Sequence, residues 1–563
     1  MKRSFCVFLR CAVTGLTIWS MMAPKAAVIA KEETENRPSR SEAFIFDGMG
    51  SHVREITTTS ARAQQFFSQG LTWMYAFNHD EAIRSFRQAA ELDPDCAMAW
   101  WGVSLSAGPQ HNHPVMTEKR TATAWGAMQK ALKLIDNTSP VERALIEALQ
   151  HRNVKREPED RASLNEAYAQ AMAKIWQAYP NDADVGTLYA EAMMVRRPWK
   201  LYSLEHEPHV DTPRIESTLE RAFEIAPNHA GALHLYIHAV EASGTSDRGL
   251  VAADRLGDLV PASGHLIHMP CHIYVKTGHW DRAIVQSEKA MRSDKKYRRL
   301  SPDQLTQHVY MTHNAHLLVY AAMMSGREKE AMAAARDMWD NVDQDILRQL
   351  GPALDRWMCS VYDVQKRFGR WDAIIDEPAP PEFMPVTTAV WHASKAVAFA
   401  AKHEFEKAER EHREFKQVMA KMPENTPWGR DIAKRVLETS DHFIAGEIAL
   451  QKRQWGAAIE HLSKAASVED TLSYGEPPQW LQPVRHTLGA VYLKSGNYAE
   501  AERVYREDLA KWRDNGWSLY GLSRALEEQG KTEEAAKVMK QHLKSWSKAD
   551  SPIVTSCKCI SRT

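Results

Sequence analysis

The chain has 563 residues, of which 44% are hydrophobic and 25% are charged. This length and composition are typical of a large globular protein, and they exclude a disordered chain, a collagen and a small disulfide-held scaffold. The 71 lysines and arginines nearly balance the 72 aspartates and glutamates, so no excess of positive charge points to nucleic acid as a partner.

Residues 1–30 have the pattern of a secretory signal. Lys2, Arg3 and Arg10 form a positive end, and the apolar run from Cys11 to Ala23 is shorter than the ~20 residues that span a membrane. The run Val28-Ile29-Ala30 offers small residues at which a signal peptidase can cleave. We therefore expect a periplasmic or secreted protein with no membrane span after cleavage. An uncleaved anchor is the alternative.

From Ala61 onward the chain shows helical spacing of its apolar residues and no alternation typical of strands. Within residues 63–96, small residues let two antiparallel helices approach, large residues fill the gap between hairpins, and a proline ends the second helix. These residues are Gly70, Ala82 and Ala89, then Trp73 and Phe86, then Pro94. The pattern resembles the tetratricopeptide repeat and recurs along the chain. The resemblance implies an all-α, right-handed superhelical solenoid of about twelve hairpins, with a concave groove lined by the first helix of each.

The recurrence of this pattern divides the chain into segments. We expect a linker at residues 31–60, a first solenoid at 61–348 that carries a histidine-rich groove, a second solenoid at 349–547, and a flexible tail at 548–563. A chain of this length does not depend on disulfides, so at most one is expected among the five cysteines that follow the signal. The pair Cys557 and Cys559 is interpreted as part of a frayed end, with metal binding or oxidation as alternatives.

Three short motifs also resemble a group of exported bacterial repeat proteins. They are the runs at 268–274 (HMPCHIY), 476–480 (EPPQW) and 515–522 (NGWSLYGL). The group has no settled activity, so the resemblance implies export and a repeat fold but no chemistry.

Histidines gather at the groove-facing positions of three consecutive units. Small residues and turn glycines place the starts of these units at Ala230, Gly264 and Thr312, without reference to histidine. In the repeat family the groove is lined mainly from the second, fifth, ninth and twelfth places of a unit, and the first three of these places give nine residues over the three units. Seven of the nine residues at these places are histidine, although a chain with 24 histidines in 563 residues would place fewer than one there by chance. They are His234, His238, His265, His268, His272, His313 and His316.

The spacing of these histidines is that of metal ligands. Two pairs are separated by four residues and one pair by three, so the members of each pair lie on one helix face. Imidazoles placed in this way bind divalent first-row metals. Stacked helices lie roughly 10 Å apart, so imidazoles of neighbouring units can meet over the groove.

Further ligands come from nearby positions. Glu191 and Glu241 fall at the ninth and twelfth places of their units, where a carboxylate can bind metal or orient an imidazole. His111 and His113 follow a first helix at the mouth of the groove, and we expect them to approach the same cavity.

Other interpretations remain open for this region. A histidine-rich groove can bind an acidic peptide or respond to pH without metal. Isolated histidines such as His52, His79 and His229 are interpreted as surface or core residues. Cys271 falls at a packing position and is interpreted as core. The insert 196–200 (RRPWK) either reaches the groove rim, where it would bind an anion, or is a solvated loop.

The leading hypothesis is therefore an exported metalloprotein with one or two transition-metal ions in its groove. Imidazole ligands favour copper, then iron or zinc, and an oxidoreductase is the first enzyme class. Tyr320 and Glu241 are the candidate catalytic residues, and Tyr236 and Trp101 are expected near the substrate, a small molecule or peptide. A scaffold that binds a protein partner without catalysis is the alternative. A zinc- or manganese-dependent hydrolase is a further one.

Overall fold

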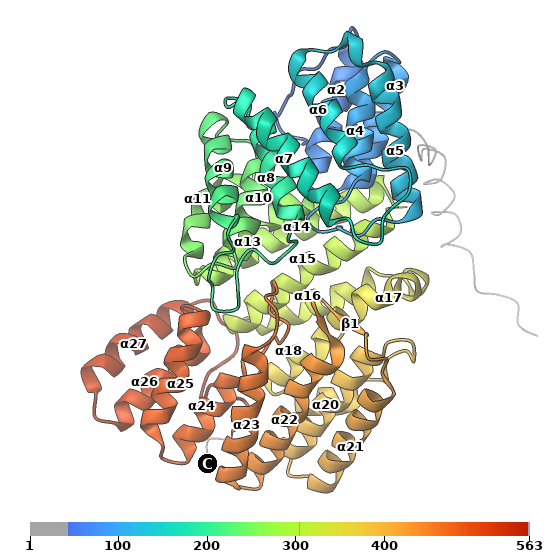
Figure 1. Cartoon of the computed structure of the whole chain (residues 1–563). Coiled ribbons are helices and arrows are strands. Elements are labelled where there is room, and N and C mark those ends of the chain that lie inside the picture. The colour runs from blue at the N-terminus through green and yellow to red at the C-terminus, as the bar shows by residue number, and fades with distance from the viewer. Residues whose placement is uncertain (1–42, 303, 561–563) are drawn as a thin grey trace, which may run out of the picture. The chain divides into compact units, whose positions relative to one another are not determined.

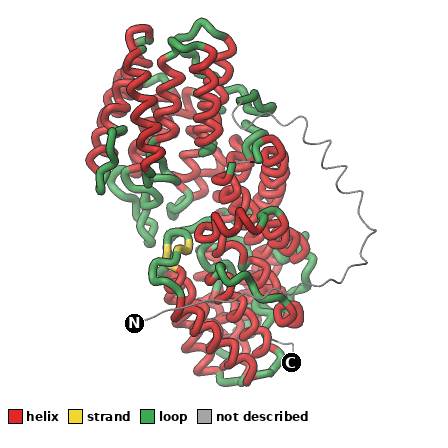
Figure 2. The backbone as a smooth tube through the Cα atoms, turned by 90° about the vertical axis from the view of Figure 1, so that its right-hand side faces the viewer, coloured by secondary structure: helices red, strands yellow, loops and turns green. Residues whose placement is uncertain are grey.

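The computed structural model describes residues 43–302 and 304–560, and the predicted signal lies outside them. The described residues form helices joined by loops, with one antiparallel pair of two-residue strands, β1 (Pro427–Trp428) and β2 (Asp431–Ile432). Figure 2 shows this pair in yellow among the red helices. The fold is an all-α helical solenoid, as predicted. None of the helices in the described ranges is both long and apolar enough to cross a membrane.

Consecutive helices of the described residues pair into hairpins (Figure 1). The first six pairs are α2 (Ala61–Tyr75) with α3 (His79–Leu92), α4 (Ala97–Ala107) with α5 (Glu118–Lys133), α6 (Pro140–Ala148) with α7 (Ala162–Ala178), α8 (Ala183–Val195) with α9 (Thr212–Ile225), α10 (Ala230–Val240) with α11 (Leu250–Leu256), and α12 (Gly264–His268) plus α13 (Pro270–Lys276) with α14 (Trp280–Leu300).

The pairing continues in the same way toward the C-terminus. The further pairs are α15 (Leu305–Met324) with α16 (Glu328–Asp340), α17 (Gln344–Met358) plus α18 (Ser360–Phe368) with α19 (Trp371–Asp376), α20 (Pro385–Ala401) with α21 (Phe405–Lys421), α22 (Ala433–Gln451) with α23 (Trp455–Asp470), α24 (Val484–Lys494) with α25 (Tyr498–Lys511), and α26 (Gly516–Glu528) with α27 (Thr532–Ser545). Short 3-10 turns follow three helices: η1 (Ile135–Asn137), η2 (Leu149–His151) and η3 (Ser246–Gly249).

At two places glycines let an aromatic ring of a second helix fit between two first helices. A Cβ added at Gly70 or at Gly102 would lie within 2.8 Å or 2.5 Å of the Phe86 ring. Gly489 and Gly521 flank Tyr505 in the same way, at 2.5 Å and 2.2 Å. The same packing therefore joins neighbouring hairpins at both ends of the solenoid.

The segment before α2 packs onto the repeats, so the prediction of a linker at 31–60 is wrong for its described part from Phe44 onward. Phe46 is buried, and its ring lies 5.1 Å from that of Trp73 and 5.8 Å from that of Tyr297. The backbone N–H and the hydroxyl of Thr57 donate to the Glu142 carboxylate at 2.7 and 2.6 Å. The segment has no helical periodicity, and its partners lie far along the chain, so a local pattern could not predict these contacts.

The chain end is also packed, so the prediction of a flexible tail is wrong for residues 551–560. Cys557 and Cys559 are buried in the core of the C-terminal hairpins and form a disulfide with each other. The Ser556 hydroxyl donates to the His486 carbonyl at 2.7 Å and lies 2.6 Å from the Tyr505 hydroxyl. The other described cysteines, Cys96, Cys271 and Cys359, are buried free thiols, in keeping with the expectation of at most one disulfide.

The close approach at Phe86 predicts the effect of adding one methyl group. Gly102→Ala should lower the free energy of unfolding by about 1–3 kcal/mol, because the new Cβ overlaps the buried ring. The control is Gly126→Ala in the neighbouring helix α5, where a Cβ meets nothing within 4 Å. Alanine there should stabilise the protein by up to about 1 kcal/mol through helix propensity. Urea unfolding measures both, and equal effects of the two substitutions would contradict this packing.

Candidate metal centre

Six histidines converge from the first helices of three consecutive hairpins. Helix α10 supplies two, α12 supplies two, α13 one and α15 one. They form two groups of three, within each of which the potential ligand atoms lie within 4.8 Å of one another. The first cluster is His234, His238 and His265, and the second cluster is His268, His272 and His313. All are buried except His313, which is partly buried.

Nε2 atoms meet at the centre of the second cluster. Nε2 of His268 lies 2.8 Å from Nε2 of His272 and 3.0 Å from Nε2 of His313. Pro270 has no backbone N–H and separates α12 from α13, yet His268 and His272 still face the same side. The second cluster is therefore built from one repeat plus a histidine of the next.

The first cluster is closed by aromatic rings. Nε2 of His265 lies 3.1 Å from Nε2 of His234. The Phe77 ring lies 4.4 Å from the ring of His234 and 5.7 Å from that of His265, and Trp199 lies 5.0 Å from His238. Both aromatic residues have a left-handed backbone, with φ of 57° and 65°. The left-handed turn at Phe77 recurs between the paired helices of other hairpins, at His403 and Arg453, so it belongs to the repeat.

One carboxylate links the two clusters. Glu241 is buried directly after α10, and its two oxygens lie 2.9 Å from Nδ1 of His238 and 2.6 Å from Nδ1 of His272. Nδ1 of His234 lies 2.6 Å from the backbone carbonyl of Tyr75. Because a carboxylate or carbonyl oxygen accepts, each Nδ1 carries the proton, and the neutral ring then presents an Nε2 lone pair to its cluster.

Five of the six clustered histidines are held in the neutral form by their surroundings. Burial lowers the pKa of His234 to about 3. His272 differs, because the Glu241 carboxylate overcomes the opposing effect of burial and raises its pKa. Burial and neighbouring positive charge lower the pKa well below the usual range at His238, His265, His268 and His313. Neutral imidazole is the form that binds metal.

A cavity of about 270 Å³ lies in front of both clusters. Histidines of the two clusters form one side of it. Further lining residues come from segments far away in the sequence, including Trp199, Arg356, Trp357, Arg430 and Glu476. Arg430 stacks on Trp199 at 3.7 Å and pairs with Glu476 at 3.3 Å. The EPPQW motif therefore meets the HMPCHIY motif at this cavity.

The loop after α4 reaches the same cavity, as expected. Nε2 of His113 lies 3.2 Å from the Tyr310 hydroxyl, and the His111 ring lies 5.5 Å from that of His238. Neither ring nitrogen of His111 has a hydrogen-bond partner among the described residues, and burial lowers its pKa to about 3. Arg120 holds the loop by donating to the His113 carbonyl at 3.2 Å.

Two predicted ligands lie apart from the clusters. Glu191 accepts a hydrogen bond from Arg152 at 3.4 Å and lines a separate small pocket. The His316 ring lies 6.0 Å from that of Trp357, and its imidazole belongs to neither cluster. The register of the repeats placed both on the correct helices, but the direction of each side chain is decided by these local partners.

The predicted aromatic candidates do not line the cavity. Tyr320 packs between Trp280 and Trp512 at ring distances of 5.8 and 5.5 Å. Tyr236 donates to a glutamate of α9, and Trp101 is buried in the core. Their expected role near a substrate is therefore wrong, because core packing takes these rings. Sequence reasoning missed Phe77, Arg356 and Arg430, for which no local motif exists. Glu476 begins the EPPQW motif, to which the sequence assigned no role in the site.

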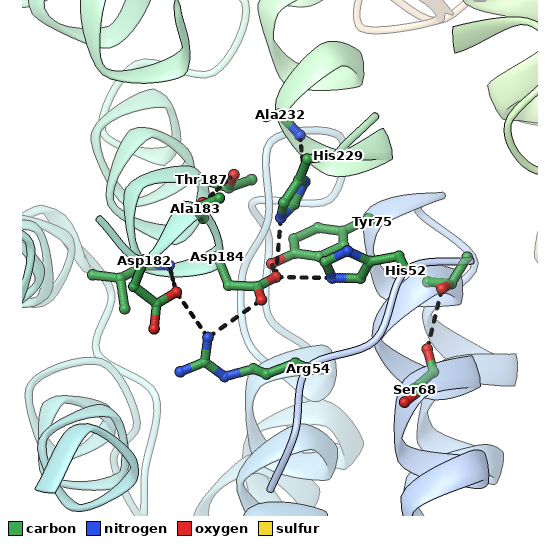
Figure 3. Close-up of polar contacts among 12 residues, drawn as sticks. His52, Arg54, Ser68, Tyr75, Asp182, Ala183, Asp184, Thr187, His229 and Ala232 are labelled. Atoms are coloured by element: carbon green, nitrogen blue, oxygen red, sulfur yellow. Dashed lines mark hydrogen bonds and ion pairs between the residues drawn. The ribbon is translucent and has the colours of Figure 1, made fainter. Parts of the chain in front are cut away.

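A separate polar group surrounds Asp184, the second residue of helix α8 (Figure 3). Its Oδ1 lies 3.1 Å from Nε2 of His52 and 3.0 Å from Nε2 of His229, and accepts from the Tyr75 hydroxyl at 2.6 Å. Its Oδ2 pairs with Arg54 at 3.2 Å. Against the desolvation of burial, bonds from the two histidines lower the pKa of Asp184 well below its usual range. Arg54 already neutralises this carboxylate, so the group anchors the N-terminal segment.

This anchor predicts a large loss on substitution. Asp184→Asn should lower the free energy of unfolding by about 3 kcal/mol, because it leaves Arg54 with one fewer charge partner in a buried site. Asp136→Asn removes an exposed partner of Arg143 and should change stability by less than about 0.5 kcal/mol. Urea unfolding at pH 7.5 measures both. A loss below 1 kcal/mol for Asp184→Asn would count against the anchor.

The lowered pKa values also predict how stability depends on pH. In metal-free protein the unfolded chain binds more protons than the folded chain below pH ~6.5, so stability should fall as pH falls through this range. Each such histidine contributes up to about 1.4 kcal/mol per pH unit. His268→Gln should reduce the slope by up to that amount, measured by urea unfolding between pH 7.5 and 5.5. Equal slopes for the two proteins would contradict the neutral state of His268.

Two regions of the chain match a known repeat. Residues 69–107 and 486–550 match the tetratricopeptide repeat, so the chain carries this repeat in both regions. No curated protein matches the sequence. Solved structures similar to it include the human IFIT1 dimer with m7Gppp-AAAA, at 15% identity over 86% of this chain and 90% of that chain, with a TM-score of 0.32. The Cut9–Hcn1 hetero-tetramer of APC/C is 14% identical over 87% and 79%, with a TM-score of 0.29. Such scores carry no conclusion about function.

Proposed function

We propose that this tetratricopeptide-repeat chain is an exported metalloprotein that binds two transition-metal ions, one in each histidine cluster. One observation carries the proposal. Nδ1 of His234, His238 and His272 is bound to an oxygen acceptor, so that the Nε2 lone pairs of these rings point toward other imidazoles. Second-shell acceptors of this kind accompany most metal-bound histidines.

The spacing of the nitrogens suits a shared ion better than hydrogen bonds alone. Ligands at ~2.0–2.1 Å from one metal lie roughly 3 Å from each other, and the observed separations are 2.8–3.1 Å. In the second cluster Nε2 of His268 faces two other Nε2 atoms, and one proton can serve only one of them. A cation that accepts all three lone pairs satisfies the whole cluster.

Copper is the first metal we propose, with iron or zinc next. Imidazole nitrogen suits all three, and copper heads the affinity order among divalent ions. The carboxylate that contacts the clusters, Glu241, already accepts from two histidines, which disfavours manganese with its preference for oxygen ligands. With a cavity beside both clusters, we propose a copper-dependent oxidoreductase that acts on a small molecule.

Two other functions have specific observations in their favour. The match of residues 69–107 and 486–550 to the tetratricopeptide repeat favours a scaffold that binds a peptide or protein partner in its groove. A zinc hydrolase would draw on Glu476, a buried carboxyl at the cavity whose pKa is raised by burial and by Glu241. The amount of bound metal distinguishes the scaffold from either metalloprotein, and the identity of the metal distinguishes the copper oxidoreductase from the zinc hydrolase.

Metal analysis of protein purified without a histidine tag or a nickel column tests the proposal. We expect about two copper ions per chain, and we expect His268→Ala with His272→Ala to lose at least one of them, because these rings form the second cluster. A chelator should lower the melting temperature of the wild type, since metal at 100 times its dissociation constant stabilises by about 2.7 kcal/mol. It should affect the double variant less.

The matched control is His442→Ala with His461→Ala. These rings also lie close together, 6.0 Å apart, but on the hairpin of α22 and α23. This control should keep both ions and the full chelator effect. Wild-type protein that holds only traces of every transition metal, and melts identically with and without chelator, would leave the scaffold as the better function.

A further inference from the structure

One charged group at the cavity lacks an opposite charge. Arg356, near the end of α17, lines the cavity, and no carboxylate of the described residues lies within ion-pair distance of it. Its nearest polar partner is the Gln479 side-chain oxygen, at 3.5 Å. Arg430 lines the same cavity but is already paired with Glu476 at 3.3 Å. Arg356 is therefore the guanidinium that remains available to an anion.

Gly429 packs directly against this guanidinium. It has φ of +62°, and a Cβ there would lie 2.6 Å from Nη1 of Arg356 and 2.9 Å from the Gln479 amide. The lack of a side chain at Gly429 therefore allows the Arg356 head group and Gln479 to take these positions at the cavity. Planar guanidinium groups bind carboxylates through two parallel hydrogen bonds.

The walls of the cavity are flat and apolar next to this charge. The Arg356 guanidinium lies 4.2 Å above the Trp357 ring, which in turn lies 5.9 Å from the ring of His313 in the second cluster. Trp199 and Tyr310 form further walls. Trp357 therefore lies between Arg356 and the histidines, where its ring can pack against an apolar part of an anion bound to Arg356.

We propose that the cavity binds a single-ring aromatic carboxylate, with the carboxylate on Arg356 and the ring between the aromatic walls and the histidine clusters. The volume of about 270 Å³ lies below the ~300–1,000 Å³ of pockets for drug-sized ligands, which favours one ring. This names the substrate class of the proposed enzyme and in that role rests on the proposed function. The binding itself rests on the cavity and Arg356.

Calorimetry with three probes tests the proposal, on the protein as purified and after metal removal. Benzoate has the ring and the charge, benzamide has the ring alone, and acetate has the charge alone. Benzoate should bind at least about tenfold more tightly than either of the others, in both forms of the protein. Arg356→Gln should make benzoate no better than benzamide, and Arg356→Lys should keep part of the preference.

Arg348→Gln is the matched control. Arg348 lies on the same helix and also stacks on an aromatic ring, that of Phe383 at 4.6 Å, but it does not line the cavity. It should bind benzoate like the wild type. Metal content measured on every sample keeps this test separate from that of the metal centre. Absence of benzoate binding up to about 10 mM, equal binding of acetate, or benzoate binding that survives Arg356→Gln and requires metal would each overturn the proposal.

Discussion

The contact between Glu241 and two imidazoles organises the centre of this protein. A buried carboxylate is costly unless hydrogen bonds or opposite charge compensate it. Glu241 accepts one hydrogen bond from Nδ1 of His238 in its own repeat and one from Nδ1 of His272 in the next repeat. The same two hydrogen bonds that stabilise the buried carboxylate also orient both imidazole rings, so that each ring directs its Nε2 atom toward a cluster.

This arrangement depends on how the repeats stack. Gly231, one turn before His234, allows the Tyr75 ring to approach, since a Cβ there would lie 2.5 Å from it. The carbonyl of Tyr75 then accepts from His234. The residue after next, Phe77, turns with positive φ and places its ring over the first cluster. Packing of α2 against α10 therefore both orients and covers the histidines.

The two sides of the cavity have different origins and different chemistry. The histidine side comes from consecutive repeats and is regular. The opposite side contains an arginine paired with a carboxylate, an arginine without one, and aromatic rings, all from segments that follow residue 355 or from the insert at Trp199. Neutral imidazoles next to positive side chains favour anionic partners. The proposed substrate class follows from this combination.

The sequence by itself determined the helical repeat and the set of histidines, because both depend on local periodicity. Glycine and aromatic spacing predicts the hairpins, and the repeat register assigns six of the clustered histidines and Glu241 to the groove. Two interpretations based on local composition were wrong, since the N-terminal segment and the residues around Cys557 pack through contacts with distant helices. Only the tertiary structure decided that the histidines divide into two groups, that His316 and Tyr320 turn elsewhere, and that Phe77, Arg356 and Arg430 join the cavity. These depend on side-chain directions and on contacts between residues hundreds of positions apart, which no local pattern records.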